Sequence, residues 1–129
     1  MKKYIICGIL LLVGCSERDE YSQAVVEQMK SDKDVNDYKI DLKNMARCVV
    51  ETSSNKMPGL LPIDPDRRQA YKNYAKMLEM SKSNDPQKAL EELRQAFGSP
   101  KNLADAHSNY AESVVECMSG LVTGAERPQ

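Results

Sequence analysis

The side chains best suited to metal, redox or nucleophilic chemistry in this 129-residue sequence are four cysteines and one histidine. They are Cys7, Cys15, Cys48, Cys117 and His107. Nucleophilic catalysis usually needs a histidine or lysine held beside a serine, cysteine or threonine. His107 has Asp105 and Ser108 close by in sequence, but side chains one or two positions apart do not face each other on a helix. We therefore expect His107 to lie in the core or in a groove, without a catalytic role.

Other signatures of catalysis or cofactor binding are missing from the sequence. It contains no glycine-rich phosphate loop, no paired-cysteine metal motif and no C-x-x-C-H haem attachment site. Carboxylates are plentiful, but solvated helix faces carry the same residues, so a catalytic pair cannot be inferred. The candidates are Glu91, Glu92, Asp105, Glu112 and Glu116. We predict a protein that is not an enzyme and that binds no cofactor or metal.

A metal site built from Cys48, Cys117 and His107 is the competing interpretation of these residues. On one helix His107 and Cys117 would lie about 15 Å apart, at about 1.5 Å per residue. Zinc bonds to nitrogen and sulfur are only about 2.0 to 2.3 Å long. The spacing therefore disfavours a shared ion.

The N-terminus has the pattern of an export signal. Lys2 and Lys3 precede an apolar run from Tyr4 to Val13, and the charged sequence SERDE follows shortly afterwards. A transmembrane helix needs about 20 apolar residues, so this run is too short to span a bilayer. Two lysines, a short apolar stretch and a small residue at its end are typical of a secretory signal peptide.

Leu12-Val13-Gly14-Cys15 resembles the lipobox of bacterial lipoproteins. The resemblance covers the first fifteen residues and implies that Cys15 is acylated on sulfur and becomes the mature N-terminus, with residues 1–14 removed. An Asp after the lipidated cysteine would imply retention in the inner membrane. Ser16 occupies that position, which implies the periplasmic side of the outer membrane. The alternative is an ordinary secretory cleavage site, in which Cys15 is only a small residue.

Removing the signal peptide and assigning Cys15 to the lipid leaves two cysteines, Cys48 and Cys117. In an oxidising periplasm two remaining cysteines of a small domain most often form a disulfide, and only one pairing exists. We predict a structural Cys48–Cys117 bridge.

The mature chain has the size of one domain. We expect the lipidated cysteine and a tether at residues 15–21, a helical domain at 22–123 and a flexible tail at 124–129. The net charge of the full chain is −1, and loss of Lys2 and Lys3 lowers it by two. Nucleic-acid binding rests on a basic patch, so this charge argues against a nucleic-acid partner.

Helical signals dominate the mature sequence. A first helix is expected from Ser22, and a second from Asp34, where apolar residues recur every three or four positions. Three further starts place a capping residue before proline, which is tolerated at the first helical position. These are Asp64-Pro65, Asp85-Pro86 and Ser99-Pro100. Alternation typical of strands is missing, so we predict an all-α bundle of four or five helices stapled by one disulfide.

The segment NKMPGLLPIDP interrupts this pattern with three prolines and a glycine. It cannot form a regular helix or a central strand. Its apolar residues either fold back into the core or remain exposed as a contact for a partner. They are Met57, Leu60, Leu61 and Ile63.

These observations together suggest an outer-membrane lipoprotein that acts through contact with another envelope protein. In size, anchor and class it is similar to small lipoproteins that act as pilots or accessory subunits of envelope complexes. One alternative is a carrier that binds a small molecule or metal inside the bundle, near His107, Tyr110 and Tyr74. The other is an inhibitor or exclusion lipoprotein, which the sequence does not separate from the first.

Overall fold

The computed structural model describes residues 16–125, and every regular element in this range is helical. The order is α1 (Ser16–Lys30), α2 (Lys33–Asp37), α3 (Leu42–Ser54), α4 (Pro65–Glu79), the 3-10 turn η1 (Met80–Lys82), α5 (Pro86–Phe97) and α6 (Pro100–Ala125). The prediction of a small all-α bundle is confirmed. The predicted signal peptide, Cys15 and residues 126–129 lie outside the described residues.

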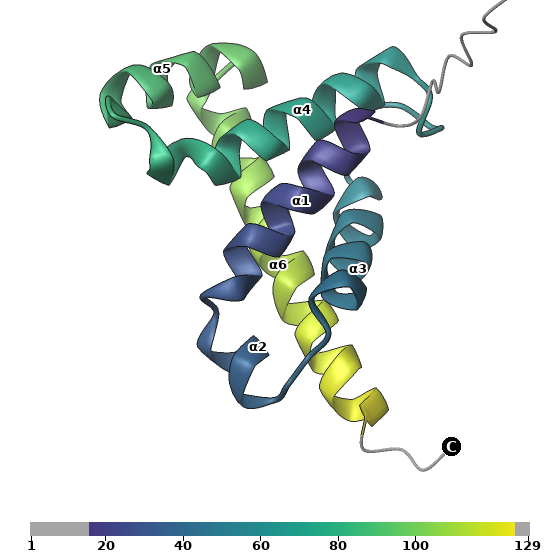
Figure 1. Cartoon of the computed structure of the whole chain (residues 1–129). Coiled ribbons are helices and arrows are strands. Elements are labelled where there is room, and N and C mark those ends of the chain that lie inside the picture. Colours follow the sequence, from purple (N-terminus) through teal and green to yellow (C-terminus); the bar gives the residue numbers. More distant parts are fainter. Residues whose placement is uncertain (1–15, 126–129) are drawn as a thin grey trace, which may run out of the picture.

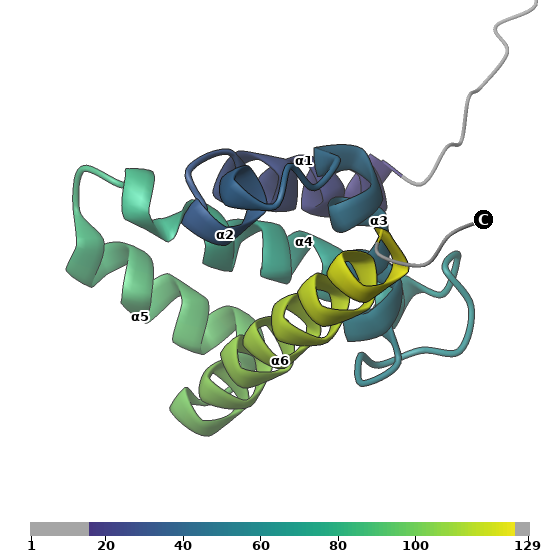
Figure 2. The same ribbon diagram turned by 90° about the horizontal axis from the view of Figure 1, so that it is seen from below.

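Helix α1 packs against both α4 and α3 and lies between them in the view of Figure 1. The long helix α6 packs against α3 and α5, and α5 also contacts α4. Figure 2 shows α5 and α6 on the opposite side of α4 from α1. None of the described helices has both the length and the apolar character needed to cross a membrane.

A cluster of tyrosines fills the centre of the bundle. Tyr21 is fully buried, and its ring contacts Tyr71 and Tyr74 at centroid distances of 6.2 and 5.4 Å. Its hydroxyl lies 2.9 Å from the Ser53 hydroxyl, so the buried oxygen has a hydrogen-bond partner. Burial is the main cause that raises the pKa of Tyr21. Tyr21 of α1 therefore contacts α4 through two tyrosine rings and α3 through the Ser53 hydroxyl.

The three helix starts predicted before proline are confirmed at Pro65, Pro86 and Pro100. Asp85 accepts a hydrogen bond from the Lys88 amide at 3.1 Å, and the Ser99 hydroxyl accepts one from the Asn102 amide at 3.0 Å. Both side chains therefore cap their helices as expected. Asp64 occupies the cap position of α4 but makes no capping bond from its side chain.

The predicted tether at residues 15–21 is wrong from Ser16 onward, because α1 begins there and not at Ser22. Two tertiary contacts hold the first two turns of α1. The Glu17 carboxylate accepts hydrogen bonds from Arg68 at 2.8 and 3.2 Å, and Tyr21 is buried in the core. Hydrogen bonding from Arg68 is the largest cause that lowers the pKa of Glu17 to about 2.

The single helix predicted from Asp34 is also wrong, since the chain forms α2 and α3 with a break between them. Lys39 has a positive φ of 53°, which a continuous helix does not allow. Asp41 then caps α3 by accepting a hydrogen bond from the Asn44 amide at 2.9 Å. At the other end, α6 reaches Ala125 and so extends past the predicted domain boundary at residue 123.

Candidate functional site

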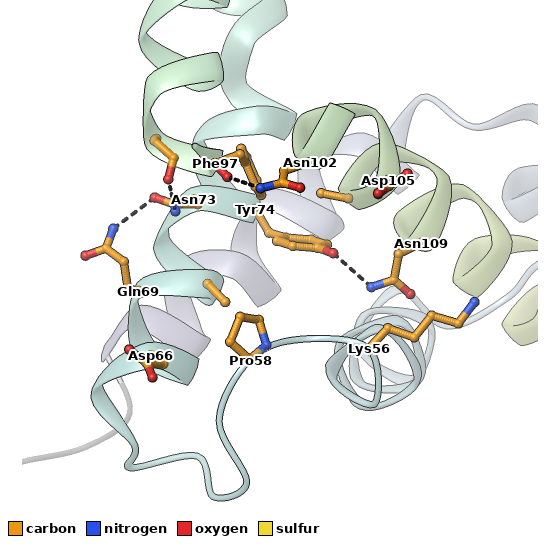
Figure 3. Close-up of a pocket in the computed structure, with 13 residues that line it drawn as sticks. Lys56, Pro58, Asp66, Gln69, Asn73, Tyr74, Phe97, Asn102, Asp105 and Asn109 are labelled. Atoms are coloured by element: carbon orange, nitrogen blue, oxygen red, sulfur yellow. Dashed lines mark hydrogen bonds between the residues drawn. The ribbon is translucent and has the colours of Figure 1, made fainter. Parts of the chain in front are cut away.

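A groove of about 500 Å³ lies between α4, the end of α5, the first half of α6 and the loop at residues 55–64 (Figure 3). We call it the amide groove, because four amide side chains line it. Its apolar surface comes from small alanines, one proline and two aromatic rings. The lining residues are Lys56, Pro58, Asp66, Gln69, Ala70, Asn73, Tyr74, Ala96, Phe97, Asn102, Asp105, Ala106 and Asn109.

The amide groups hold the walls of the groove together. Asn73 donates from α4 to the Ala96 carbonyl of α5 at 3.1 Å, and Asn102 donates to the Phe97 carbonyl at 2.9 Å. Asn109 donates from α6 to the Tyr74 hydroxyl and to the Ser53 carbonyl, both at 2.9 Å. Figure 3 shows Tyr74 and Asn109 pointing toward each other across the groove. Because these NH₂ groups donate within the protein, they stiffen the groove.

The charged groups of the amide groove lie at its rim. Asp66 and Asp105 are exposed and come from α4 and α6, and Figure 3 shows them on different sides of Tyr74. The Lys56 ammonium donates to Glu112 at 2.7 Å, and this hydrogen bond is the main cause that raises the pKa of Lys56. The rim therefore carries two carboxylates, Asp66 and Asp105, and one ammonium that is paired outside the groove lining.

The side chains that line the amide groove are mostly amides, carboxylates and small apolar groups. None of its lining residues is a cysteine, serine or histidine. Burial raises the pKa of Tyr74, so its phenol stays protonated at neutral pH. Asp105 is exposed and forms an ion pair with Lys101 at 2.6 Å. Nucleophile and base are therefore not paired among the groove residues.

The apolar loop beside the groove divides its residues between the core and solvent. Met57 is 6% exposed and packs in the core. The prediction that the loop folds back into the core therefore holds for this residue alone. Leu60, Leu61 and Ile63 are 92, 56 and 71% exposed. We call these three residues the loop tip. Its use as a contact stays a prediction.

Two charged side chains of the start of α4 hold the loop in shape. The guanidinium of Arg67, which is buried, donates to the carbonyl oxygens of Met57, Pro58 and Gly59. The Asp64 carboxylate accepts hydrogen bonds from the Leu60 and Leu61 amides at 2.7 and 2.9 Å. The loop tip is therefore presented on a rigid support.

The Cys48–Cys117 disulfide is confirmed and joins α3 to α6, with the Cα atoms 5.8 Å apart. The Thr52 hydroxyl lies 3.5 Å from the Cys117 sulfur, and Cys117 is buried. Because the two sulfurs bond to each other, they are not thiolate ligands for an ion with His107. Within residues 16–125, no three His, Cys, Asp or Glu side chains are grouped so that they could hold a metal ion.

His107 is exposed, so of the two positions predicted for it, the core is wrong and a groove is confirmed. The buried positions of α6 are instead Ala106, Asn109, Ser113 and Cys117. His107 and Tyr110 line a separate groove of about 490 Å³, together with apolar residues of α4, α5 and α6. Tyr74 lines the amide groove instead, so the three residues expected for a carrier do not share one pocket.

Sequence reasoning missed the residues that give the groove and the loop their shape, which are Arg67, Asn73 and Asn109. Asn73 and Asn109 are each 6% exposed. Both belong to the repeated tripeptide Asn-Tyr-Ala, and each stands next to a tyrosine, but the apolar pattern does not place either asparagine in the core. Arg67 gives no signal either, because Arg68 follows it and either could face solvent.

Comparisons of this chain with models of protein families, with curated protein sequences and with solved structures found no match.

Proposed function

We propose that this protein is a lipoprotein held by Cys15 to the periplasmic face of the outer membrane, and that it acts by contact with another envelope protein. The lipobox supports the anchor, and Ser16 after the cysteine supports the outer over the inner membrane. Two or three acyl chains hold a protein at a membrane far more firmly than one. The domain needs no further anchor to remain there.

The observation that carries the protein contact is the amide groove, with its amide-braced walls, its apolar floor and the carboxylates of Asp66 and Asp105 at its rim. A preorganised surface binds with a smaller entropic cost than a mobile one. We propose that its occupant is a segment of the partner that places an apolar side chain on Ala70 and Ala106. Lysines or arginines beside that side chain would face Asp66 and Asp105.

Affinity capture of the acylated protein from its own cells tests this function. The groove variant combines Asp66→Lys with Asp105→Lys, and the matched control combines Asp34→Lys with Glu92→Lys. All four residues are exposed, and the control pair does not line the groove. We expect an envelope protein to be enriched by the native chain and by the control, and to be lost with the groove variant because the rim charge is reversed.

Two results would contradict the proposal at different points. If no envelope protein is enriched over a Cys15→Ser chain, the protein-contact function is wrong. If both charge variants capture the partner equally, the contact lies elsewhere on the surface. Mass measurement of the mature protein tests the anchor separately, since it should show acyl mass on Cys15.

A further inference from the structure

The loop tip lies at the same end of the bundle as the start of α1. Glu17, in the first turn of α1, pairs with Arg68, in the first turn of α4. The loop leads directly into α4, and the neighbouring Arg67 binds its carbonyl oxygens. Figures 1 and 2 both show the loop on the side of the bundle where α1 begins. A short series of contacts therefore connects Ser16 with Leu60, Leu61 and Ile63.

No flexible spacer separates this end of the bundle from the proposed lipid. Because α1 begins at Ser16, Cys15 is the residue immediately before the first helical turn. Consecutive Cα atoms lie about 3.8 Å apart. If Cys15 carries the lipid, the first turns of α1 and α4 lie at the membrane surface, and the loop lies there with them.

Two backbone amides of the loop tip already have hydrogen-bond partners within the protein. Leu60 and Leu61 donate their amides to Asp64, and the Leu61 carbonyl accepts from the Asp64 amide at 3.0 Å. Pro58 and Pro62 have no N–H. Unpaired backbone groups are costly in an apolar medium, so this internal pairing favours entry of the tip into lipid. The three exposed side chains of the tip are all apolar.

We propose that Leu60, Leu61 and Ile63 insert into the same lipid leaflet that holds the acyl chains of Cys15. This inference rests on the lipid anchor of the proposed function and replaces the protein contact that the sequence suggested for the loop. Apolar groups of interfacial proteins enter the headgroup and acyl boundary by about 5 to 10 Å. The loop tip is a second attachment point, and two points restrict how the bundle tilts at the membrane.

Tryptophan fluorescence tests the insertion, because the native chain contains no tryptophan. The acylated full-length chain carrying Leu60→Trp is reconstituted into vesicles of phosphatidylethanolamine and phosphatidylglycerol, with or without brominated acyl chains. Asn84→Trp is the matched control. It is exposed and follows the far end of α4, about 22 Å along that 15-residue helix from the loop.

We expect the emission of Leu60→Trp to shift to the blue in vesicles and to be quenched by the brominated lipid, while Asn84→Trp shows neither change. An acylated Leu60→Trp chain that is not quenched overturns the insertion and leaves the anchor intact. A blue shift that needs native membranes and escapes quenching also overturns it, because a protein then covers the loop. Absence of acyl mass on Cys15 contradicts both proposals.

Discussion

At the scale of single residues, Arg67 and Asp64 both hold the backbone of the loop by hydrogen bonds, and they do so with opposite charges. Arg67 is 8% exposed, and carbonyl oxygens of the loop solvate its guanidinium. Buried charges are expensive unless hydrogen bonds satisfy them, and several carbonyl dipoles meet this need. Asp64 turns its carboxylate toward the Leu60 and Leu61 amides and so leaves the cap position of α4 without a side-chain bond.

Loss of the Asp64 carboxylate should loosen the loop tip. We expect Asp64→Ala to speed hydrogen exchange of the Leu60 and Leu61 amides, because both lose their acceptor. Asp66→Ala, an exposed position two residues further along, is the control and should leave both amides protected. Exchange measured by NMR checks this. Equal exchange in the two variants would mean that Asp64 does not hold the loop.

Acid should release the same two bonds. Hydrogen bonds from Leu61 and Leu60 lower the pKa of Asp64 below the usual value of 3.8. A group with a lowered pKa in the folded state stabilises above its ordinary pKa, and this contribution is lost as the pH falls through the lowered value. The carboxyl carbon of Asp64 should therefore titrate below pH 3.8 by NMR. A midpoint at or above 3.8 would contradict the bonding.

At the scale of elements, the loop depends on a glycine that no other residue replaces well. Gly59 has φ of +81°, and a Cβ there would lie 2.9 Å from the Cβ of Arg67 and 3.0 Å from its backbone nitrogen. Gly98, which ends α5, also has a positive φ, of +92°. A Cβ at Gly98 would meet only the Asn102 amide at 3.6 Å. The two glycines therefore share a backbone conformation and differ in their surroundings.

Alanine substitutions at Gly59 and Gly98 separate two energetic costs, the strain of a positive φ and the steric clash of an added Cβ. A left-handed conformation costs a residue other than glycine about 1 to 2 kcal/mol, so Gly98→Ala should lower the free energy of unfolding by about that amount. We expect Gly59→Ala to lower it further, because Arg67 must move and lose its carbonyl contacts. Urea unfolding measures both. If both variants lose the same free energy of unfolding, the loop around Gly59 accommodates the added Cβ without a clash.

The element boundaries show which signals are local and which are not. A cap residue before proline acts within one turn of helix, so the starts of α4, α5 and α6 were readable from Asp64-Pro65, Asp85-Pro86 and Ser99-Pro100. The start of α1 was not, because it depends on Arg68, a residue 51 positions away. The break after α2 was also missed. Tyr38 continues the three- and four-residue spacing of apolar residues and so suggests one helix, but it is 61% exposed and lies in the break.

At the scale of the whole molecule, the disulfide restricts the unfolded chain more than any local feature does. Cys48 and Cys117 are separated by 69 positions and lie on α3 and α6. In the chain-entropy model, closing a loop of this length contributes about 4 kcal/mol, a large part of the roughly 5 to 15 kcal/mol that stabilises a typical domain. The bridge holds the long helix α6 to the rest of the bundle.

Removal of the bridge should be measured against removal of Cys15, the proposed lipid site. We expect the double change Cys48→Ala and Cys117→Ala to lower the free energy of unfolding by about 4 kcal/mol in urea. The control Cys15→Ser leaves the Cys48–Cys117 bond in place and should not change it. If the double variant has the same free energy of unfolding as the control, the disulfide contributes little to stability.

The sequence by itself determined the helical class, the three proline-marked helix starts and the disulfide pair. Each depends on a local signal or on counting, because caps act within a turn and two cysteines have one pairing. Only the tertiary structure decided that α1 starts at Ser16, that Asn73 and Asn109 brace a groove, and that Met57 is buried while Leu60 is exposed. These features depend on contacts between residues far apart in the chain, and the pattern of neighbouring residues does not encode such contacts.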